Sequence, residues 1–279
     1  MHIELLIYTL FGLVIGSFLN VCIYRIPLGK SIVSPRSACP NCGTLIHFFD
    51  NIPVLSYLVL RGKCRSCGHP ISIQYPVVEL LTGAAFYACA SRWDFASPTY
   101  VNTLLLSVVI VLVFTDYHHQ ILPNVLTLPG IAAGLFLSRF QSVSFYSFDF
   151  LSLKTASWLW PGRPQLALPW VGSLVGAIIG GGLPLLVGLG YKKLRKRQGL
   201  GMGDVKMMAM VGAFLGYPLA ILTLLLGSFF GSLVGILLMI FRHANLQTKL
   251  ALGVFLGIST TISLFYGLPF LQWYGHIAR

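Results

Sequence analysis

Long apolar runs, separated by short polar segments, are the feature that most constrains the fold of this chain. The first run covers about residues 3–26, and several later runs approach or exceed the roughly 20 residues that cross a bilayer as a helix. Only 9% of the 279 residues are charged, whereas about 25% is usual in soluble domains. The runs predict an all-α polytopic membrane protein with about eight transmembrane helices.

The distribution of basic residues predicts how these helices are oriented. Most of the 19 Lys and Arg residues fall between helices on one side, which is typical of positive-inside topology. We therefore place the basic segments in the cytoplasm and exclude nucleic acid as a partner, despite the net charge of +12. The N-terminus lacks a basic region and a cleavage site, so the first helix is expected to be retained. The predicted helices cover about residues 3–26, 75–90, 100–115, 123–138, 170–194, 205–216, 219–241 and 250–265.

Polarity changes along the chain predict three parts. Residues 1–26 form the first transmembrane helix, residues 27–75 a small cytoplasmic domain, and residues 76–279 a seven-helix membrane domain. Within the third part, residues 139–169 form an outer loop rich in Ser, Phe and Trp, to which the sequence assigns no chemistry.

The cytoplasmic segment contains two Cys-x-x-Cys-Gly motifs. Cys39 and Cys42 form the first, and Cys64 and Cys67 the second. Four thiolates suit a closed tetrahedral zinc site with a structural role. Two disulfides are the alternative, but stable disulfides are rare in the reducing cytoplasm. The spacing therefore predicts a zinc site formed by all four cysteines.

Two of the seven acidic residues lie at comparable places, at the cytoplasmic ends of predicted helices. Asp116 follows one helix, and Asp204 precedes another within Gly-Met-Gly-Asp-Val-Lys. We expect them to meet and share a proton, one acting as general base on a water and the other as general acid toward a carbonyl. The helix dipoles predict Asp116 to be the more protonated partner. Gly201 and Gly203 leave room beside Asp204 for a peptide strand.

Carboxylates in membranes also occur in proton relays, so a proton-coupled transporter is an alternative. Such a transporter would favour inverted repeats and broken helices at the midplane, which the sequence does not display. An assembly scaffold with an inactive aspartate pair is a third possibility.

The motifs together resemble those of the type IV prepilin peptidases. They are Gly16-Ser17-Phe18-Leu19-Asn20-Val21, Tyr24-Arg25-Ile26-Pro27, the two cysteine pairs, Asp50-Asn51-Ile52-Pro53, Leu60-Arg61-Gly62-Lys63-Cys64, Tyr75-Pro76-Val77-Val78-Glu79-Leu80-Leu81-Thr82, Asp116 with Ile121-Leu122-Pro123-Asn124, and Gly201-Met202-Gly203-Asp204-Val205-Lys206. The resemblance covers nearly the whole chain.

The resemblance implies that Asp116 and Asp204 are the catalytic aspartates of a GxGD-type membrane protease in the bacterial inner membrane. It implies cleavage of the basic leader of prepilins and pseudopilins, followed by N-methylation with S-adenosylmethionine, in pilus biogenesis or type II secretion. Glu79 and Asp50 could contact the leader's lysines, although a carboxylate at a helix start, as Glu79 is, also suits the helix dipole. The last helix departs from the family's Pro-Phe-Gly-Pro-like segment, with Ala251-Leu252-Gly253-Val254-Phe255 in its place.

Overall fold

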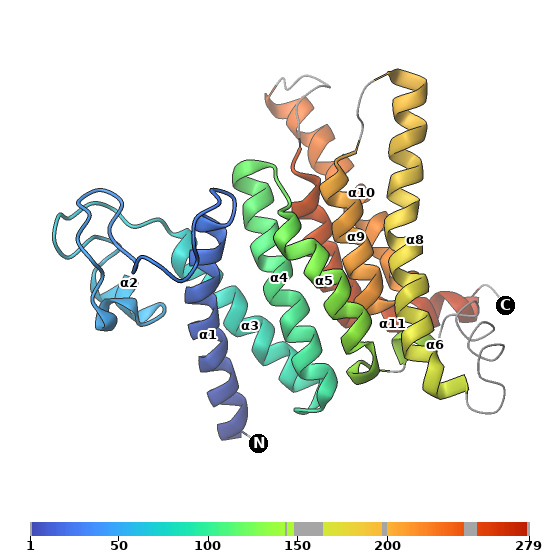
Figure 1. The fold of residues 1–279 in the computed structure, drawn as a ribbon, viewed down its shortest axis with the longest axis horizontal. Helices are drawn as coiled ribbons and strands as arrows, with labels where there is room; N and C mark the ends of the chain where they lie inside the picture. Colours follow the sequence, from blue (N-terminus) through green and yellow to red (C-terminus); the bar gives the residue numbers. More distant parts are fainter. Residues whose placement is uncertain (1, 143, 148–163, 197–199, 243–249, 278–279) are drawn as a thin grey trace. The chain divides into compact units, whose positions relative to one another are not determined.

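The protein is mainly helical in its computed structural model, which describes residues 2–142, 144–147, 164–196, 200–242 and 250–277 (Figure 1). Two isolated β-bridges, Ala38 with Leu45 and Lys63 with Pro70, lie in the polar segment that follows the first helix. The elements are α1 His2–Arg25, η1 Phe48–Asn51, α2 Leu55–Val59, α3 Gln74–Trp93, α4 Ser97–His119, α5 Asn124–Leu137, η2 Ser138–Phe140, α6 Ser144–Ser147, α8 Pro164–Arg195, α9 Met202–Leu215, α10 Tyr217–Arg242 and α11 Leu252–Ile277.

Each apolar segment that was predicted to be helical forms a helix within the described residues. Five helices are long and apolar enough to cross a membrane, fewer than the eight predicted spans. Of the other three, α5 and α9 have only 14 residues each, and α3 falls outside the five although it has 20. The five stretches are His2–Arg25, Ser97–His119, Leu168–Leu194, Tyr217–Phe241 and Leu252–Tyr274.

Helix ends differ from the sequence-based expectation at both aspartates. Helix α4 continues to His119, so Asp116 lies inside its last turn and not after it. Helix α9 begins at Met202, so Asp204 lies in its first turn and not before it. Part of the expected outer loop is also helical, because α6 and the start of α8 fall within residues 139–169. Residues 148–163 of that loop lie outside the described residues.

The chain divides into two compact units, Met1–Thr115 and Asp116–Arg279. The boundary falls inside α4, immediately before Asp116. The predicted division into residues 1–26, 27–75 and 76–279 follows membrane topology, whereas this division follows compactness, so the former stays a prediction.

Small residues bring α1 and α3 of unit 1 into close contact. A Cβ added to Gly16 would lie 2.6 Å from Glu79 Cα, and one added to Gly12 would lie 2.7 Å from Phe86 Cγ. Gly16 therefore allows the two helices to pack closely, as is usual for small residues between apolar helices. Asn20, one turn further, is buried and donates through Nδ2 to the carbonyls of Gly16 and Tyr75, at 3.3 and 3.1 Å.

The segment between α1 and α3 has almost no apolar core of its own. Among residues 27–75, only Cys39 and Gly62 are buried. Arg25, at the end of α1, fixes the beginning of this segment. Its guanidinium donates to the carbonyls of Ser31 and Pro35 at 2.9 and 2.7 Å. Hydrogen bonds and the cysteine cluster described below therefore organise this segment.

Unit 2 is built around α9, which contacts α5, α8, α10 and α11 (Figure 1). Nine of its 14 residues are buried. Helix α8 comes so close that Gly176 and Gly212 meet backbone to backbone, and neither position has space for a side chain. Glycine at this crossing is therefore a requirement of packing.

Side chains close the C-terminal end of α9. The Gln141 amide and the Tyr146 hydroxyl donate to the Phe214 carbonyl at 3.3 and 3.1 Å, and the Ser173 hydroxyl donates to the Ala213 carbonyl at 2.6 Å. Carbonyls in the last turn of a helix lack partners inside the helix, so these donors replace water there. The segment to which the sequence assigned no chemistry thus contributes Gln141 and Tyr146 to the fold.

Candidate active site and candidate metal centre

Asp116 lies in the last turn of α4, and only 5% of its surface is exposed. Its carboxylate accepts hydrogen bonds from the backbone amides of Gly253 and Val254, which are in the first turn of α11. The start of a helix carries unpaired N–H groups and a partial positive charge, so it favours a carboxylate. Oδ2 of Asp116 is buried and has no hydrogen-bond partner among the described residues.

Asp204 lies half-buried in the first turn of α9, and its carboxylate accepts a hydrogen bond from the Gly201 backbone. It is near enough to Asp116 for the charge of that residue to act on it. Within unit 2, the two aspartates that the sequence singled out therefore lie within electrostatic range of each other. Two neighbouring carboxylates disfavour double ionisation, which suits a shared proton.

The amides of α11 remove the basis for predicting which aspartate is more protonated. That prediction considered only the C-terminal dipole of α4, which disfavours a negative charge on Asp116. The N-terminus of α11 acts in the opposite direction on the same carboxylate. This contact was missed because nothing local to Asp116 points to residue 253; the only sequence signal was the atypical segment at 251–255.

Leu122 fills the space between two glycines beside the aspartates. A Cβ on Gly203 would lie 2.8 Å from Leu122 Cβ, and a Cβ on Gly253 would lie 3.1 Å from Leu122 Cδ2. Packing is therefore sufficient reason for glycine at 203. Gly201 is more open: the nearest atom to an added Cβ would be Asp204 Oδ2, at 3.0 Å.

A hydrogen bond joins the first turns of α5 and α9. Lys206 donates from Nζ to Asn124 Oδ1 at 2.7 Å. Both residues belong to motifs that the sequence linked to the aspartates. The bond ties the helix that holds Asp204 to the helix that follows Leu122.

The four cysteines gather into one cluster in unit 1. Their sulfur atoms all lie within 4.8 Å of one another, and no disulfide joins them. Sγ of Cys39 lies 3.8 Å from Sγ of Cys67, so the two motifs share one site. Tetrahedral zinc with bonds of about 2.3 Å places its sulfur ligands about 3.8 Å apart. The cluster can therefore hold a metal of this geometry.

The two cysteine motifs form matching turns. Gly43 donates its N–H to the Cys39 carbonyl and Gly68 to the Cys64 carbonyl, both at 2.9 Å. Both glycines have a φ of about 70°, which side chains resist, although each has open space around it. The Thr44 hydroxyl and amide lower the pKa of Cys42 to about 6, and amides near Cys64 lower the pKa of that thiol. Thiolates are the form that binds metal.

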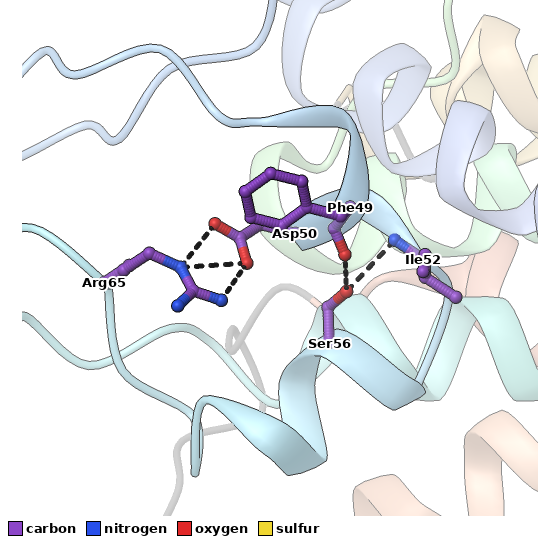
Figure 2. Close-up of polar contacts among 5 residues, drawn as sticks. All are labelled: Phe49, Asp50, Ile52, Ser56 and Arg65. Atoms are coloured by element: carbon purple, nitrogen blue, oxygen red, sulfur yellow. Dashed lines mark hydrogen bonds and ion pairs between the residues drawn. The ribbon is translucent and has the colours of Figure 1, made fainter.

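The two acids predicted to contact substrate already have partners in unit 1. Asp50 forms a two-oxygen ion pair with Arg65, with contacts of 2.6 to 3.1 Å (Figure 2). This guanidinium lowers the pKa of Asp50. Glu79 is buried and accepts the Val54 backbone N–H on Oε2 at 2.7 Å. The charge of Asp50 is therefore neutralised by Arg65. Glu79, in contrast, forms no ion pair with any of the described residues.

These features define a class: a helical protein with membrane-spanning segments, a pair of adjacent aspartates and a four-cysteine candidate metal centre. Comparison with known proteins makes the class specific. Residues 10–93 match the Bacterial Peptidase A24 N-terminal domain, and residues 103–236 match the Type IV leader peptidase family. The chain belongs to the type IV leader peptidase family, which confirms the resemblance seen in the sequence.

Relatives named prepilin leader peptidase/N-methyltransferase align with most of the chain. The Aeromonas hydrophila relative is 33% identical over 95% of this chain and 91% of its own length. The Pseudomonas aeruginosa relative is 32% identical over 92% and 89%. The Myxococcus xanthus relative is 39% identical over 82% of this chain, and the match spans 61% of that longer protein. No solved structure matches the chain.

Proposed function

We propose that this protein is a membrane aspartic endopeptidase that cleaves the basic leader of type IV prepilins and pseudopilins. The observation that carries the proposal is the pair of carboxylates formed by Asp116 and Asp204 in unit 2. Relatives along most of the chain are named for prepilin cleavage, which supports the choice of substrate. The cleavage serves pilus assembly or type II secretion.

The chemistry needs one ionised and one protonated carboxylate. The ionised aspartate takes a proton from a water, and the oxygen of that water attacks the carbonyl carbon of the scissile peptide bond. The protonated aspartate donates its proton to the carbonyl oxygen. Collapse of the tetrahedral intermediate breaks the C–N bond, and the departing amine takes up a proton. The amides at the start of α11 hold Asp116 in place through this cycle.

The site lies at the cytoplasmic face of the inner membrane in this proposal. The basic segments between helices support that orientation through the positive-inside rule. Glu79 and Asp50 contact the basic leader, and Gly201 and Gly203 border the bound peptide. Glu79→Gln with an unchanged KM for prepilin would remove Glu79 from this role, and Asp50→Asn tests Asp50 in the same way.

Zinc held by the four cysteines is a structural element of the proposal. The sulfur spacing fits a tetrahedral ion, and four protein ligands leave no open position for catalysis. After cleavage, the new N-terminus is methylated with S-adenosylmethionine as methyl donor. The names of the relatives support this second activity.

The experiment is cleavage of a prepilin in membranes by wild type, Asp116→Asn and Asp204→Asn. Both variants keep side-chain size but cannot exchange the proton, so we expect the rate to fall at least about 10³-fold. Asp94→Asn is the matched control. Asp94 is exposed at the end of α3 with a φ of 48°, a conformation that Asn tolerates, and its cleavage rate should equal that of wild type.

Equal insertion of all four proteins, shown by membrane fractionation, makes the rates comparable. A wild-type rate in either Asp116→Asn or Asp204→Asn would overturn the proposal. Loss of cleavage in both would also discard the inactive-scaffold alternative. A pH-driven proton flux through the protein in liposomes, without cleavage, would instead favour the transporter.

A further inference from the structure

The cysteine segment, residues 27–75, has an apolar surface that its own core does not cover. Residues 48–59 comprise η1, α2 and the three residues between them, and we call them the arm. Exposed apolar patches of some size mark contacts with a protein or a membrane. Six large apolar side chains of the arm are 45–82% exposed: Phe48, Phe49, Ile52, Leu55, Leu58 and Val59.

Hydrogen bonds hold the arm in one shape. The Ser56 hydroxyl donates to the Phe49 carbonyl at 2.9 Å and accepts the Ile52 N–H at 3.1 Å, which joins α2 to η1 (Figure 2). The ion pair between Asp50 and Arg65, with its shortest contact at 2.6 Å, joins the arm to the second cysteine motif. The apolar side chains are therefore displayed by a folded element that is attached to the cysteine cluster.

Contacts with α1 and α3 fix the level at which the arm lies. The N–H of Val54, the residue before α2, donates to Glu79 Oε2 at 2.7 Å. Glu79 in turn packs on α1 at Gly16, where an added Cβ would lie 2.6 Å from Glu79 Cα. Gly16 precedes Arg25, the last residue of α1, by nine residues, which is about 14 Å along a helix. A Glu side chain covers only part of this distance, so the start of α2 lies beside α1 and not beyond its end.

Two further contacts agree with this level. Asn20 donates from Nδ2 to the Tyr75 carbonyl at 3.1 Å, so α3 begins beside α1 before α1 has ended. Arg25 donates to the carbonyls of Ser31 and Pro35, which keeps that part of the cysteine segment at the end of α1. The segment therefore extends from the end of α1 back along its side to the arm.

Helix α1 is one of the five candidate membrane spans, so lipid surrounds it wherever protein does not. Apolar elements at a membrane surface lie about 5–10 Å into the boundary between headgroups and acyl chains. Charge indicates the same occupant. Arg61 and Lys63 come just after α2 and are exposed, whereas Asp50, the only acid in residues 27–73 of the sequence, is paired with Arg65. Positive charge beside an apolar surface complements anionic lipid headgroups.

We propose that the arm inserts its apolar side chains into the membrane leaflet at the C-terminal end of α1, where Arg61 and Lys63 bind anionic lipid headgroups. Long basic side chains suit this role, because their stems lie along apolar surface while their charges reach the headgroups. The cysteine cluster is thereby held at the membrane surface instead of lying free in water. The inference concerns how the protein contacts lipid and does not depend on the proposed peptidase chemistry.

The first experiment measures the depth of the arm in the full-length protein, reconstituted into vesicles that contain phosphatidylglycerol. A fluorescent amino acid replaces Leu58 in one variant and Val33 in another, and lipids brominated along their acyl chains quench it on contact. Val33 is the matched control: it is apolar and 87% exposed, yet it lies between the two residues that Arg25 holds at the end of α1. We expect at least about twofold quenching at position 58 and less at position 33. Equal quenching at both positions, or none at position 58, would overturn the insertion.

The second experiment tests charge in the variant that carries the fluorophore at position 58. Replacement of phosphatidylglycerol by phosphatidylcholine should reduce the quenching, and Arg61→Gln/Lys63→Gln should remove this dependence on lipid charge. Arg36→Gln is the control, because it removes an exposed cation of the same segment outside the arm, and it should retain the dependence. Quenching that is independent of lipid charge, or a control that behaves as the double variant does, would refute the headgroup contacts.

Unmodified protein keeps the inference testable if a variant does not fold. A phospholipid with a photoreactive diazirine in its acyl chain is crosslinked to wild type, and the labelled peptides are identified by mass spectrometry. Labels within residues 48–59 are expected in the absence of any prepilin, and their absence would overturn the inference. If the fluorophore at position 58 is shielded from aqueous iodide only after prepilin is added, the surface binds substrate instead of lipid and the inference fails.

Discussion

The cysteine segment of unit 1 and the helices around α9 in unit 2 hold functional groups by different means. Among residues 27–75 only two residues are buried, whereas nine of the 14 residues in α9 are. The cysteine segment relies on its sulfur cluster, glycine turns and an exposed ion pair. The aspartates rely on backbones that touch at glycines. Loss of the cluster should therefore be local, whereas loss of a glycine contact should spread through unit 2.

Removal of the proposed zinc should have the largest effect, and only in unit 1. Structural zinc contributes about 10–16 kcal/mol of binding free energy in small domains, so chelation or Cys42→Ser should unfold residues 39–68. Hydrogen exchange followed by mass spectrometry should show loss of protection there. Amides of α9 should keep their protection, and a matching loss in α9 would contradict the contrast between the regions.

Gly176→Ala should have the second-largest effect, and only in unit 2. A methyl group at this position overlaps the Gly212 backbone, so α8 and α9 must separate at a cost of about 1–3 kcal/mol. The melting temperature and the cleavage rate should both fall. Gly182→Ala on the same helix is the control, because no atom lies within 4 Å of its added Cβ. Equal stability of the two variants would argue against the tight crossing.

Gly253→Ala should reduce cleavage more than stability. Its Cβ would lie 2.8 Å from Asp116 Oδ2, so the carboxylate must shift within the pair. Displacements of this size can cost about 10²-fold in rate. Gly231→Ala in α10 has its nearest neighbour at 3.5 Å and should cleave normally. The expected signature is a lower kcat with unchanged KM and melting temperature; a change in KM alone would point to substrate binding.

Arg65→Ala should have the smallest effect. The pair with Asp50 is exposed, and exposed ion pairs contribute little to stability. Because Arg65 lowers the pKa of Asp50, the contribution exists at neutral pH and fades as pH falls through that lowered pKa. The difference in melting temperature between Arg65→Ala and wild type should therefore be smaller at pH 3 than at pH 7. A larger difference at pH 3 would reverse this sign.

The sequence predicted features that depend on local pattern. Helices follow apolar runs, and the cysteine spacing predicted a shared site. Asp116 and Asp204 stood out because few acids lie near apolar runs. The contacts that hold those aspartates were not predictable, because they pair distant residues through the backbone. The amides at 253 and 254, and the packing of Leu122, leave no periodic signal in the chain.

The polar pairings inside unit 1 could not be predicted from the sequence either. Asp50 was predicted to contact substrate, and its local surroundings gave no reason to choose Arg65, 15 residues away, as its partner. The close contact of Gly16 with α3 was predictable because small residues on a helix face favour it. The sequence also did not indicate that Oδ1 of the buried Asn20 lacks a hydrogen-bond partner among the described residues.

The shortness of α9 has a consequence for how water reaches the reaction. Fourteen residues rise about 21 Å, less than the roughly 30 Å of hydrocarbon in a bilayer. Its C-terminal carbonyls are served by Gln141, Tyr146 and Ser173, so that end can remain dry. If the C-terminal end of α9 lies at one membrane surface, the end with Asp204 lies below the lipid headgroups of the other surface. In the proposed peptidase, hydrolysis at Asp204 then requires an aqueous inlet through the membrane surface.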